Sequence, residues 1–310
     1  MDPEQLADKL KAGDRRTVAR LISLVEDEDP HMADVVRALG PLVGNAYVVG
    51  LTGAPGVGKS TLAAAMVKAI RADDLSVSVL AIDPTSPFTG GALLGDRLRM
   101  QEHATDPGVF IRSMATRGHL GGLAWAAPHA LRVLDAAGAD VIVVETVGVG
   151  QAEVDVVHAA DTTLVTLAPG MGDEIQANKA GILEIADVFV VNKADKEGAR
   201  RTVRDIEQML HLGAAKDWTP PVLLTQADTG EGVDELWEQI RKHRAHLEST
   251  GELRARRLRR AAREISEIAV ARVRRSIGEP GDSETLDRLA ADVLEGRLDP
   301  YAAADRLGAT

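Results

Sequence analysis

Eight consecutive residues of this 310-residue chain have the types and spacing needed to bind a polyphosphate. They are Gly53, Ala54, Pro55, Gly56, Val57, Gly58, Lys59 and Ser60. Glycines let backbone N–H groups curl around phosphates, the Lys59 ammonium can reach the β and γ phosphates, and the Ser60 hydroxyl can ligate Mg²⁺. An apolar run precedes the loop, and Thr61 opens a helix-like run whose first N–H groups favour an anion. This order of strand, loop and helix predicts a nucleoside triphosphatase.

A second motif, Asn192-Lys193-Ala194-Asp195, directly follows an apolar strand-like run over 187–191. The Asp195 carboxylate can accept hydrogen bonds from guanine N1–H and the exocyclic amine, while Asn192 braces neighbouring loops and the Lys193 stem covers the base. Adenine presents the opposite donor and acceptor pattern and would leave buried groups unpaired. The motif therefore predicts GTP and GDP as the ligands.

A third loop follows the strand-like run over 221–225 and reads Gln226-Ala227-Asp228. In guanine-binding proteins a loop at this position offers backbone contacts to the base. A plain strand-to-helix turn is the alternative interpretation. The loop supports guanine recognition without deciding it.

Two acidic residues stand at the ends of strand-like runs, Asp83 after 76–82 and Glu145 after 140–144. Carboxyl ends of parallel strands face the crevice in which ligands bind, so both side chains can reach Mg²⁺ directly or through water. Glu145 is longer than the aspartate common at this place, so we expect its metal contact to pass through water. Gly148 is positioned to offer its N–H to the γ phosphate.

Two segments combine breakers or glycine hinges with charged groups. Residues 84–99 contain one acid, Asp96, and suit a mobile switch around the γ phosphate and its metal, with Asp96 either a ligand or an ordinary surface acid. Residues 169–179 are interpreted as a second mobile element, with a helix start at Asp173 as the alternative. No glutamine directly follows Gly148. We therefore expect slow intrinsic hydrolysis that a partner accelerates or gates.

The composition favours a parallel sheet covered by helices and excludes several classes of site. Hydrophobic residues make up 45% of the chain and aromatic residues only 3%, so Ala, Val, Leu and Ile must fill the core. The absence of cysteine excludes disulfides, thiolate zinc sites and cysteine nucleophiles. A formal net charge of −11 argues against nucleic acid as a partner. Neither a leader-like start nor an apolar run near about 18 residues is present, so we expect a cytoplasmic protein without membrane contact.

The pattern along the chain predicts three parts. Residues 1–45 form an N-terminal helical extension, with Asp14 as a helix N-cap and Pro30 as a breaker. Residues 46–245 form a P-loop domain of the α/β class, a mostly parallel sheet covered by helices on both faces. Its strands are expected over 46–52, 77–83, 109–113, 140–146, 162–168, 187–192 and 221–225. Residues 246–310 form a helical arm.

The arm begins with an arginine-rich segment from Arg254 to Ile277. Apolar residues recur every three or four positions in it, at Leu258, Ala262, Ile265, Ala269 and Val273. Glutamates interrupt the arginines and no aromatic residue lies among them, so we interpret the segment as a solvated helix face with an apolar packing or dimer seam. Two shorter helices are expected around 283–295 and 300–307.

These motifs together resemble the MeaB/ArgK family of GTPases, which includes the human methylmalonic aciduria type A protein. The most specific match is the run Glu145-Thr146-Val147-Gly148-Val149-Gly150-Gln151, beside the phosphate loop, Asp83-Pro84, Gly95-Asp96-Arg97 and the guanine motif. Gly13-Asp14-Arg15-Arg16 and Asp299-Pro300-Tyr301-Ala302-Ala303 are also similar to family signatures, so the resemblance covers nearly the whole chain.

The resemblance implies a GTP-driven chaperone that gates cofactor loading of an adenosylcobalamin-dependent acyl-CoA mutase, usually methylmalonyl-CoA mutase, and protects it. It implies Mg²⁺-binding acids at Asp83, Asp96 and Glu145, and a third switch at about 170–179 in which Gln176 and Lys179 respond to the partner. It also implies a homodimer joined through the C-terminal helices. The assignment of a mutase as the partner rests on the resemblance alone.

Three other functions remain open at this point. One is a non-enzymatic binding module that uses GTP as a structural ligand and would yield no hydrolysis product. A metallochaperone GTPase of the nickel-insertion type has a similar core, but its usual cysteine ligands are missing and the histidines here are scattered. A kinase acting on an amino-acid-binding transport protein would prefer ATP, which fits poorly with the guanine motif. Metal titration and nucleotide preference separate the latter two functions from a GTP-driven chaperone.

Overall fold

The computed structural model describes residues 6, 8–10, 12–27, 29, 31–84, 103, 105–116, 122–146, 158–170, 184–212, 217–278 and 283–308. The chain divides into two compact units, Met1–Arg260 and Ala261–Thr310. The first contains the sheet and the second is helical. The predicted domain boundary near residue 245 falls inside a helix of the first unit and stays a prediction.

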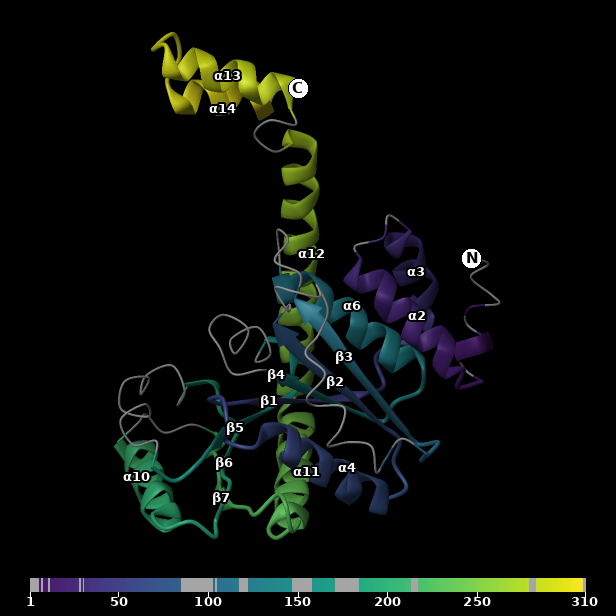
Figure 1. The fold of residues 1–310 in the computed structure, drawn as a ribbon, viewed down its shortest axis with the longest axis vertical. Coiled ribbons are helices and arrows are strands. Elements are labelled where there is room, and N and C mark those ends of the chain that lie inside the picture. Colours follow the sequence, from purple (N-terminus) through teal and green to yellow (C-terminus); the bar gives the residue numbers. More distant parts are fainter. Residues whose placement is uncertain are drawn as a thin grey trace. The chain divides into compact units, whose positions relative to one another are not determined.

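A seven-stranded sheet in the order β3-β2-β4-β1-β5-β6-β7 forms the centre of the first unit (Figure 1). The strands are β1 (Tyr47–Thr52), β2 (Val77–Pro84), β3 (Val109–Thr116), β4 (Val141–Thr146), β5 (Thr162–Leu167), β6 (Val188–Val191) and β7 (Val222–Leu224). The pairings among these seven strands are all parallel, which confirms the predicted fold class. From β1 the chain builds one half of the sheet and then the other, so the strand order changes direction at β1, and ligands of open parallel sheets bind at the carboxyl end of such a strand.

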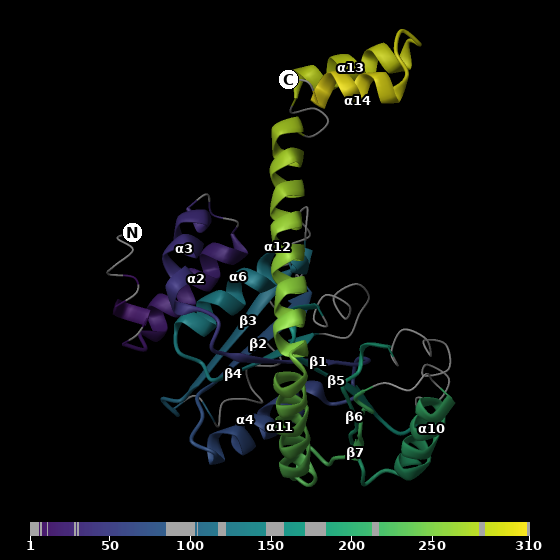
Figure 2. The same ribbon diagram turned by 180° about the vertical axis from the view of Figure 1, so that it is seen from behind.

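Helices cover both faces of this sheet (Figures 1 and 2). One face packs against α2 (Arg15–Glu26), α3 (Met32–Leu39) and α6 (Gly122–Ala136), and its far end against α10 (Ala199–Leu212). The other face packs against α4 (Lys59–Ala72) and α11 (Val233–Thr250). A 3-10 turn, η1 (Gly40–Leu42), leads into β1. Burial on both faces explains why the inner strands are apolar runs without alternation.

The N-terminal helices are part of the first unit's core. Asp14 caps α2 as predicted, because its carboxylate accepts from the Arg16 backbone N–H at 3.0 Å. Arg112 of β3 pairs with Glu26 at 2.8 Å and fixes α2 against the sheet. Pro30 lies outside the described residues.

The C-terminal helices are α12 (Glu252–Ile277), α13 (Glu284–Leu294) and α14 (Pro300–Gly308), close to the predicted ranges. The interpretation of the arginine-rich segment as a solvated face is wrong for Arg256, Arg257 and Arg260, which pair with the buried carboxylates of Asp161 and Asp187. The apolar positions Leu258, Ile265 and Val273 are exposed. Among the described residues, no helix combines the length and the hydropathy needed to cross a membrane.

Candidate functional site

The phosphate loop joins the carboxyl end of β1 to the first turn of α4, and two of its glycines are required by their surroundings. Gly53 has φ +140°, and a Cβ there would lie 2.1 Å from the Thr166 carbonyl oxygen of β5. Gly58 has φ +96°, and a Cβ there would lie 2.5 Å from Asn192 Nδ2. Only glycine fits both the backbone conformation and the close approach. The loop is thereby held against β5 and the end of β6.

Lys59 is buried at the start of α4, with 6% of its surface exposed. Its Nζ donates to the carbonyl oxygens of Gly53 at 2.6 Å and Ala54 at 3.0 Å. These bonds hold the ammonium over the loop and limit the rotamers that a lysine would otherwise sample. The cation is therefore already placed where the loop's backbone N–H groups would surround a phosphate.

Ser60 and Glu145 meet beside the loop. Ser60 Oγ donates to Glu145 Oε1 at 2.6 Å, and both side chains are buried. The contact arises because β4 lies next to β1, with Glu145 in register with Leu51. A hydroxyl and a carboxylate are hard oxygen ligands of the kind that Mg²⁺ prefers. These two residues fit a metal site between the loop and β4.

Asn192 links three loops from the end of β6. Its Nδ2 donates to the Val57 carbonyl oxygen at 2.9 Å, and its Oδ1 accepts from the Ala227 N–H at 3.1 Å and from Thr225 Oγ1 at 3.2 Å. The amide therefore positions the phosphate loop and the loop after β7 together. Thr225 ends a predicted strand but is absent from the predicted site residues, although its place directly before Gln226 is a detectable signal.

The other residues of the guanine motif lie at the same edge of the sheet. Lys193 has φ +59° and donates from Nζ to the Gly56 carbonyl oxygen at 2.6 Å, so its stem crosses the loop. Asp195 is exposed and accessible to a ligand. Gln226 pairs with Glu231 across a tight turn, Ala227 is buried and Asp228 is exposed.

The remaining predicted residues are placed as follows. Pro55 is exposed and Thr61 lies in the first turn of α4. The backbone of Asp83 lies at the end of β2, paired with Ala115. Asp96, Gly148, Gln176 and Lys179 lie outside the described residues. Within the described part of the chain, the phosphate loop, Glu145, the guanine motif and the loop after β7 come together at the carboxyl edge of the sheet.

Comparison with known proteins identifies the family of this chain. A family model, "Methylmalonyl Co-A mutase-associated GTPase MeaB", matches residues 18–280. A putative GTPase of Pyrococcus abyssi is 52% identical over 98% of this chain and 95% of its own length. The GTPase ArgK of Escherichia coli is 38% identical over 79% of this chain and 77% of its own.

More distant relatives extend the same similarity. The mouse mitochondrial methylmalonic aciduria type A homolog is 33% identical over 98% of this chain and 78% of its own length. A solved structure of an LAO/AO transport system kinase superposes with a TM-score of 0.74 at 27% identity, covering 99% of this chain and 96% of the other. The family match, the loop that holds Lys59 and the brace at Asn192 all agree, and the chain belongs to the MeaB family and is a P-loop GTPase.

Proposed function

We propose that this protein is a Mg²⁺-dependent chaperone that binds and hydrolyses GTP in order to gate cofactor loading of an adenosylcobalamin-dependent acyl-CoA mutase and to protect that enzyme. The mutase proposed is methylmalonyl-CoA mutase. The observation that carries the proposal is the match over 18–280 to a family named for its association with that mutase. The mouse relative, named for methylmalonic aciduria, supports the same partner.

Hydrolysis by these residues would depend on positioning and charge neutralisation. Lys59 would bind the β and γ phosphates while the loop N–H groups surround them, and Gly148 would donate to the γ phosphate. Bound Mg²⁺ would neutralise charge developing between the β and γ phosphates. Ser60, Glu145, Asp83 and Asp96 are the residues proposed to hold it.

Guanine selectivity would come from Asp195, with Lys193 against the base and Ala227 offering its backbone. The side-chain amide of Asn192 is hydrogen-bonded to Val57, Ala227 and Thr225. Its proposed role is therefore to hold the phosphate loop and the loop after β7 in place. Gln176 and Lys179 are proposed to respond to the mutase partner. We also propose a cytoplasmic homodimer joined through α12, α13 and α14, whose exposed residues include Leu258, Ile265 and Val273.

GTP turnover measured with and without purified methylmalonyl-CoA mutase tests this function. We expect the partner to change the turnover rate, and unchanged turnover together with no co-purification would contradict the chaperone role. Lys59→Ala should abolish triphosphate binding while its circular dichroism stays native, which ties turnover to this site. Titration with ATP addresses the kinase function for which the solved relative is named. A preference for ATP over GTP would favour that alternative.

A further inference from the structure

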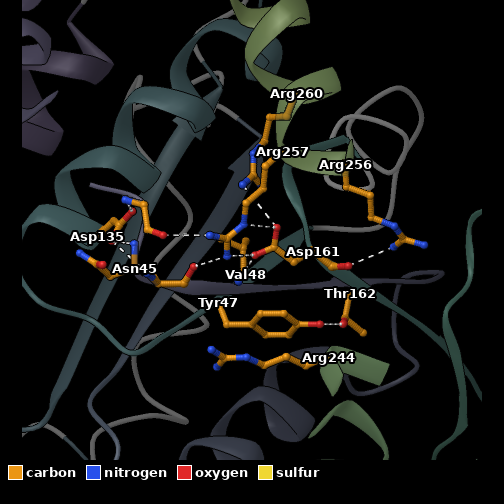
Figure 3. A network of polar contacts seen from close by, with 12 residues as sticks. Asn45, Tyr47, Val48, Asp135, Asp161, Thr162, Arg244, Arg256, Arg257 and Arg260 are labelled. Carbon is orange, nitrogen blue, oxygen red and sulfur yellow. Dashed lines mark hydrogen bonds and ion pairs between the residues drawn. The ribbon is translucent and has the colours of Figure 1, made fainter. Parts of the chain in front are cut away.

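A network of ion pairs lies at the amino-terminal edge of the sheet, opposite the phosphate loop. Asp161 precedes β5 and Asp187 precedes β6, and both are buried. Figure 3 shows Arg257 and Arg260 of α12 converging on Asp161, with Arg256 reaching the Asp161 carbonyl oxygen beside them. Buried carboxylates need such partners, since an unpaired charge in the interior is strongly destabilising.

Arg256 holds Asp187 in a two-point contact. Its Nη1 and Nη2 lie 2.8 Å and 2.9 Å from the two carboxylate oxygens of Asp187. A planar guanidinium that binds a carboxylate through two parallel hydrogen bonds fixes its orientation as well as its charge. His243 Nε2 lies 3.3 Å from Asp187 Oδ1, and the Trp218 indole donates to the Asp187 carbonyl oxygen at 2.8 Å. The start of β6 is thus held from α12 and the loop before β7, with the His243 ring of α11 packed beside it.

Asp187 and Asn192 are the residues that flank β6 on either side. β6 has only four residues, Val188–Val191, and lies between β5 and the three-residue β7. At one end the Asp187 carboxylate accepts from the Thr163 N–H at 2.8 Å and the Asp187 N–H donates to the Thr163 carbonyl oxygen at 3.0 Å. At the other end the Asn192 N–H donates to the Leu167 carbonyl oxygen at 2.9 Å.

Because β6 is so short, few backbone hydrogen bonds fix its position along the strand axis relative to β5 and β7. The distance from Asp187 to Asn192 is about 17 Å at the usual rise per residue of a strand. The Asp187 carboxylate adds one hydrogen bond, from the Thr163 N–H, to those that join β5 and β6. Arg256 fixes the orientation of that carboxylate. A shift of Asp187 along the strand would move Asn192 and the guanine motif by the same amount.

We propose that Arg256 is a positioning residue for guanine recognition, acting through Asp187 and β6 on the loop 192–195. This inference rests on the proposed role of Asp195 in binding the base. It makes the first turns of α12 a determinant of nucleotide selectivity, from the edge of the sheet opposite the ligand.

The neighbouring pair of Arg257 and Asp161 provides a matched control. Arg257 contacts Asp161 at 2.9 Å from the same helix, and the two arginine side chains have similar exposure, 29% for Arg256 and 27% for Arg257. Asp161 precedes β5, which has six residues and, unlike β6, does not lead into the guanine motif, and Asp161 keeps its contact with Arg260 when Arg257 is changed. Losing the Arg257 pair should lower stability without moving Asn192.

Calorimetric titration with GDP, IDP and ADP tests the inference on the full chain. IDP lacks the exocyclic amine of guanine, so the ratio of GDP to IDP affinity measures the Asp195 contact. We expect Arg256→Met to weaken GDP by about tenfold, as for a misaligned charge-assisted hydrogen bond, and to weaken IDP less, so that the ratio falls. We expect Arg256→Met and Arg257→Met to lower the unfolding temperature by similar amounts. Arg257→Met should leave the ratio of GDP to IDP affinity at its wild-type value.

Equal GDP to IDP ratios in wild type and Arg256→Met, with matched losses of stability in the two arginine variants, would overturn the proposal. If Arg256→Met does not fold, Arg256→Lys serves instead, because it keeps the charge and loses the two-point geometry, and it should lower the ratio in the same direction. Wild-type protein that binds GDP and ADP equally would refute guanine recognition itself. Failure of guanine recognition can be told apart from failure of the Arg256 proposal, because it is seen in the wild-type protein before any arginine is changed.

Discussion

Ser60 and Glu145 share a hydrogen bond of 2.6 Å although 85 residues separate them in the chain. The bond exists because β4 is the neighbour of β1, which carries the Glu145 carboxylate to the first turn of α4. A buried carboxylate that accepts from the Ser60 hydroxyl orients that O–H toward β4. The pair therefore joins the first turn of α4 to β4 at the point where a metal would be needed.

Glu145→Gln should retain nucleotide binding and lose hydrolysis. The amide keeps the shape of the side chain and an oxygen that accepts from Ser60, but it removes the negative charge. We therefore expect GTP turnover to fall about a hundredfold and the Mg²⁺ concentration needed for half-maximal turnover to rise. Turnover across a Mg²⁺ titration measures both effects. Glu238→Gln on the exposed face of α11 is the control. Turnover within twofold of wild type would exclude Glu145 from the metal site.

The strands were predictable because buried parallel strands are short runs of Val, Ile and Leu bounded by glycine or charged residues. The phosphate loop and guanine motif were predictable because each occupies the end of such a run. β3 extends to Thr116, three residues beyond its predicted end. Arg112 and Ser113 interrupt the apolar pattern there, and the sequence does not show that Arg112 is paired with Glu26 of α2.

The ion pairs at the amino-terminal edge of the sheet could not be predicted, because their partners are far apart in the sequence. The charges of Arg256, Arg257 and Arg260 on one helix face are typical of a solvated surface, and only the fold brings them to Asp161 and Asp187. These pairs have sequence separations of 69 to 101 residues when the contact of Arg260 with the Ala159 carbonyl oxygen is included. Local charge pattern carries no information about partners so distant.

Gly58→Ala should disrupt nucleotide binding more than Gly56→Ala. Both glycines have positive φ, so each alanine adds strain of about 1 kcal/mol. At Gly58 the new methyl would also lie 2.5 Å from Asn192 Nδ2, whereas at Gly56 nothing lies within 4 Å. Titration with GDP should therefore show the larger loss for Gly58→Ala. Equal losses would mean that the approach of Asn192 to the loop does not matter.

Asp195→Asn should lower the preference for guanine over adenine and shift it toward xanthine. The amide replaces one acceptor oxygen with a donor, so it no longer matches both guanine N–H groups and can instead donate to the extra carbonyl of xanthine. Competition between GDP, XDP and ADP measures the change. Asp234→Asn, exposed in the first turn of α11, should leave the GDP preference unaltered. An unchanged preference in Asp195→Asn would place base recognition elsewhere.

His243 should make the folded state sensitive to acid. Burial lowers its pKa from 6.5 to about 4, with Asp187 opposing the shift and Arg256 and His246 adding to it. The ring also lies 2.8 Å from Thr162 Oγ1 through Nδ1. Because the folded state holds the neutral ring while the unfolded chain takes up a proton below about pH 6.5, the stabilisation is complete above that pH and is lost toward pH 4.

The loss should amount to about 3 kcal/mol once the pH is below both pKa values. Urea unfolding at a series of pH values between about 7 and 3.5 measures it, and His243→Gln should flatten the dependence because glutamine does not titrate. His211→Gln, exposed near the end of α10, should keep the wild-type dependence. If His243→Gln loses stability with falling pH as steeply as wild type, the proton is taken up by another group and His243 is not the acid-sensitive residue at this edge of the sheet.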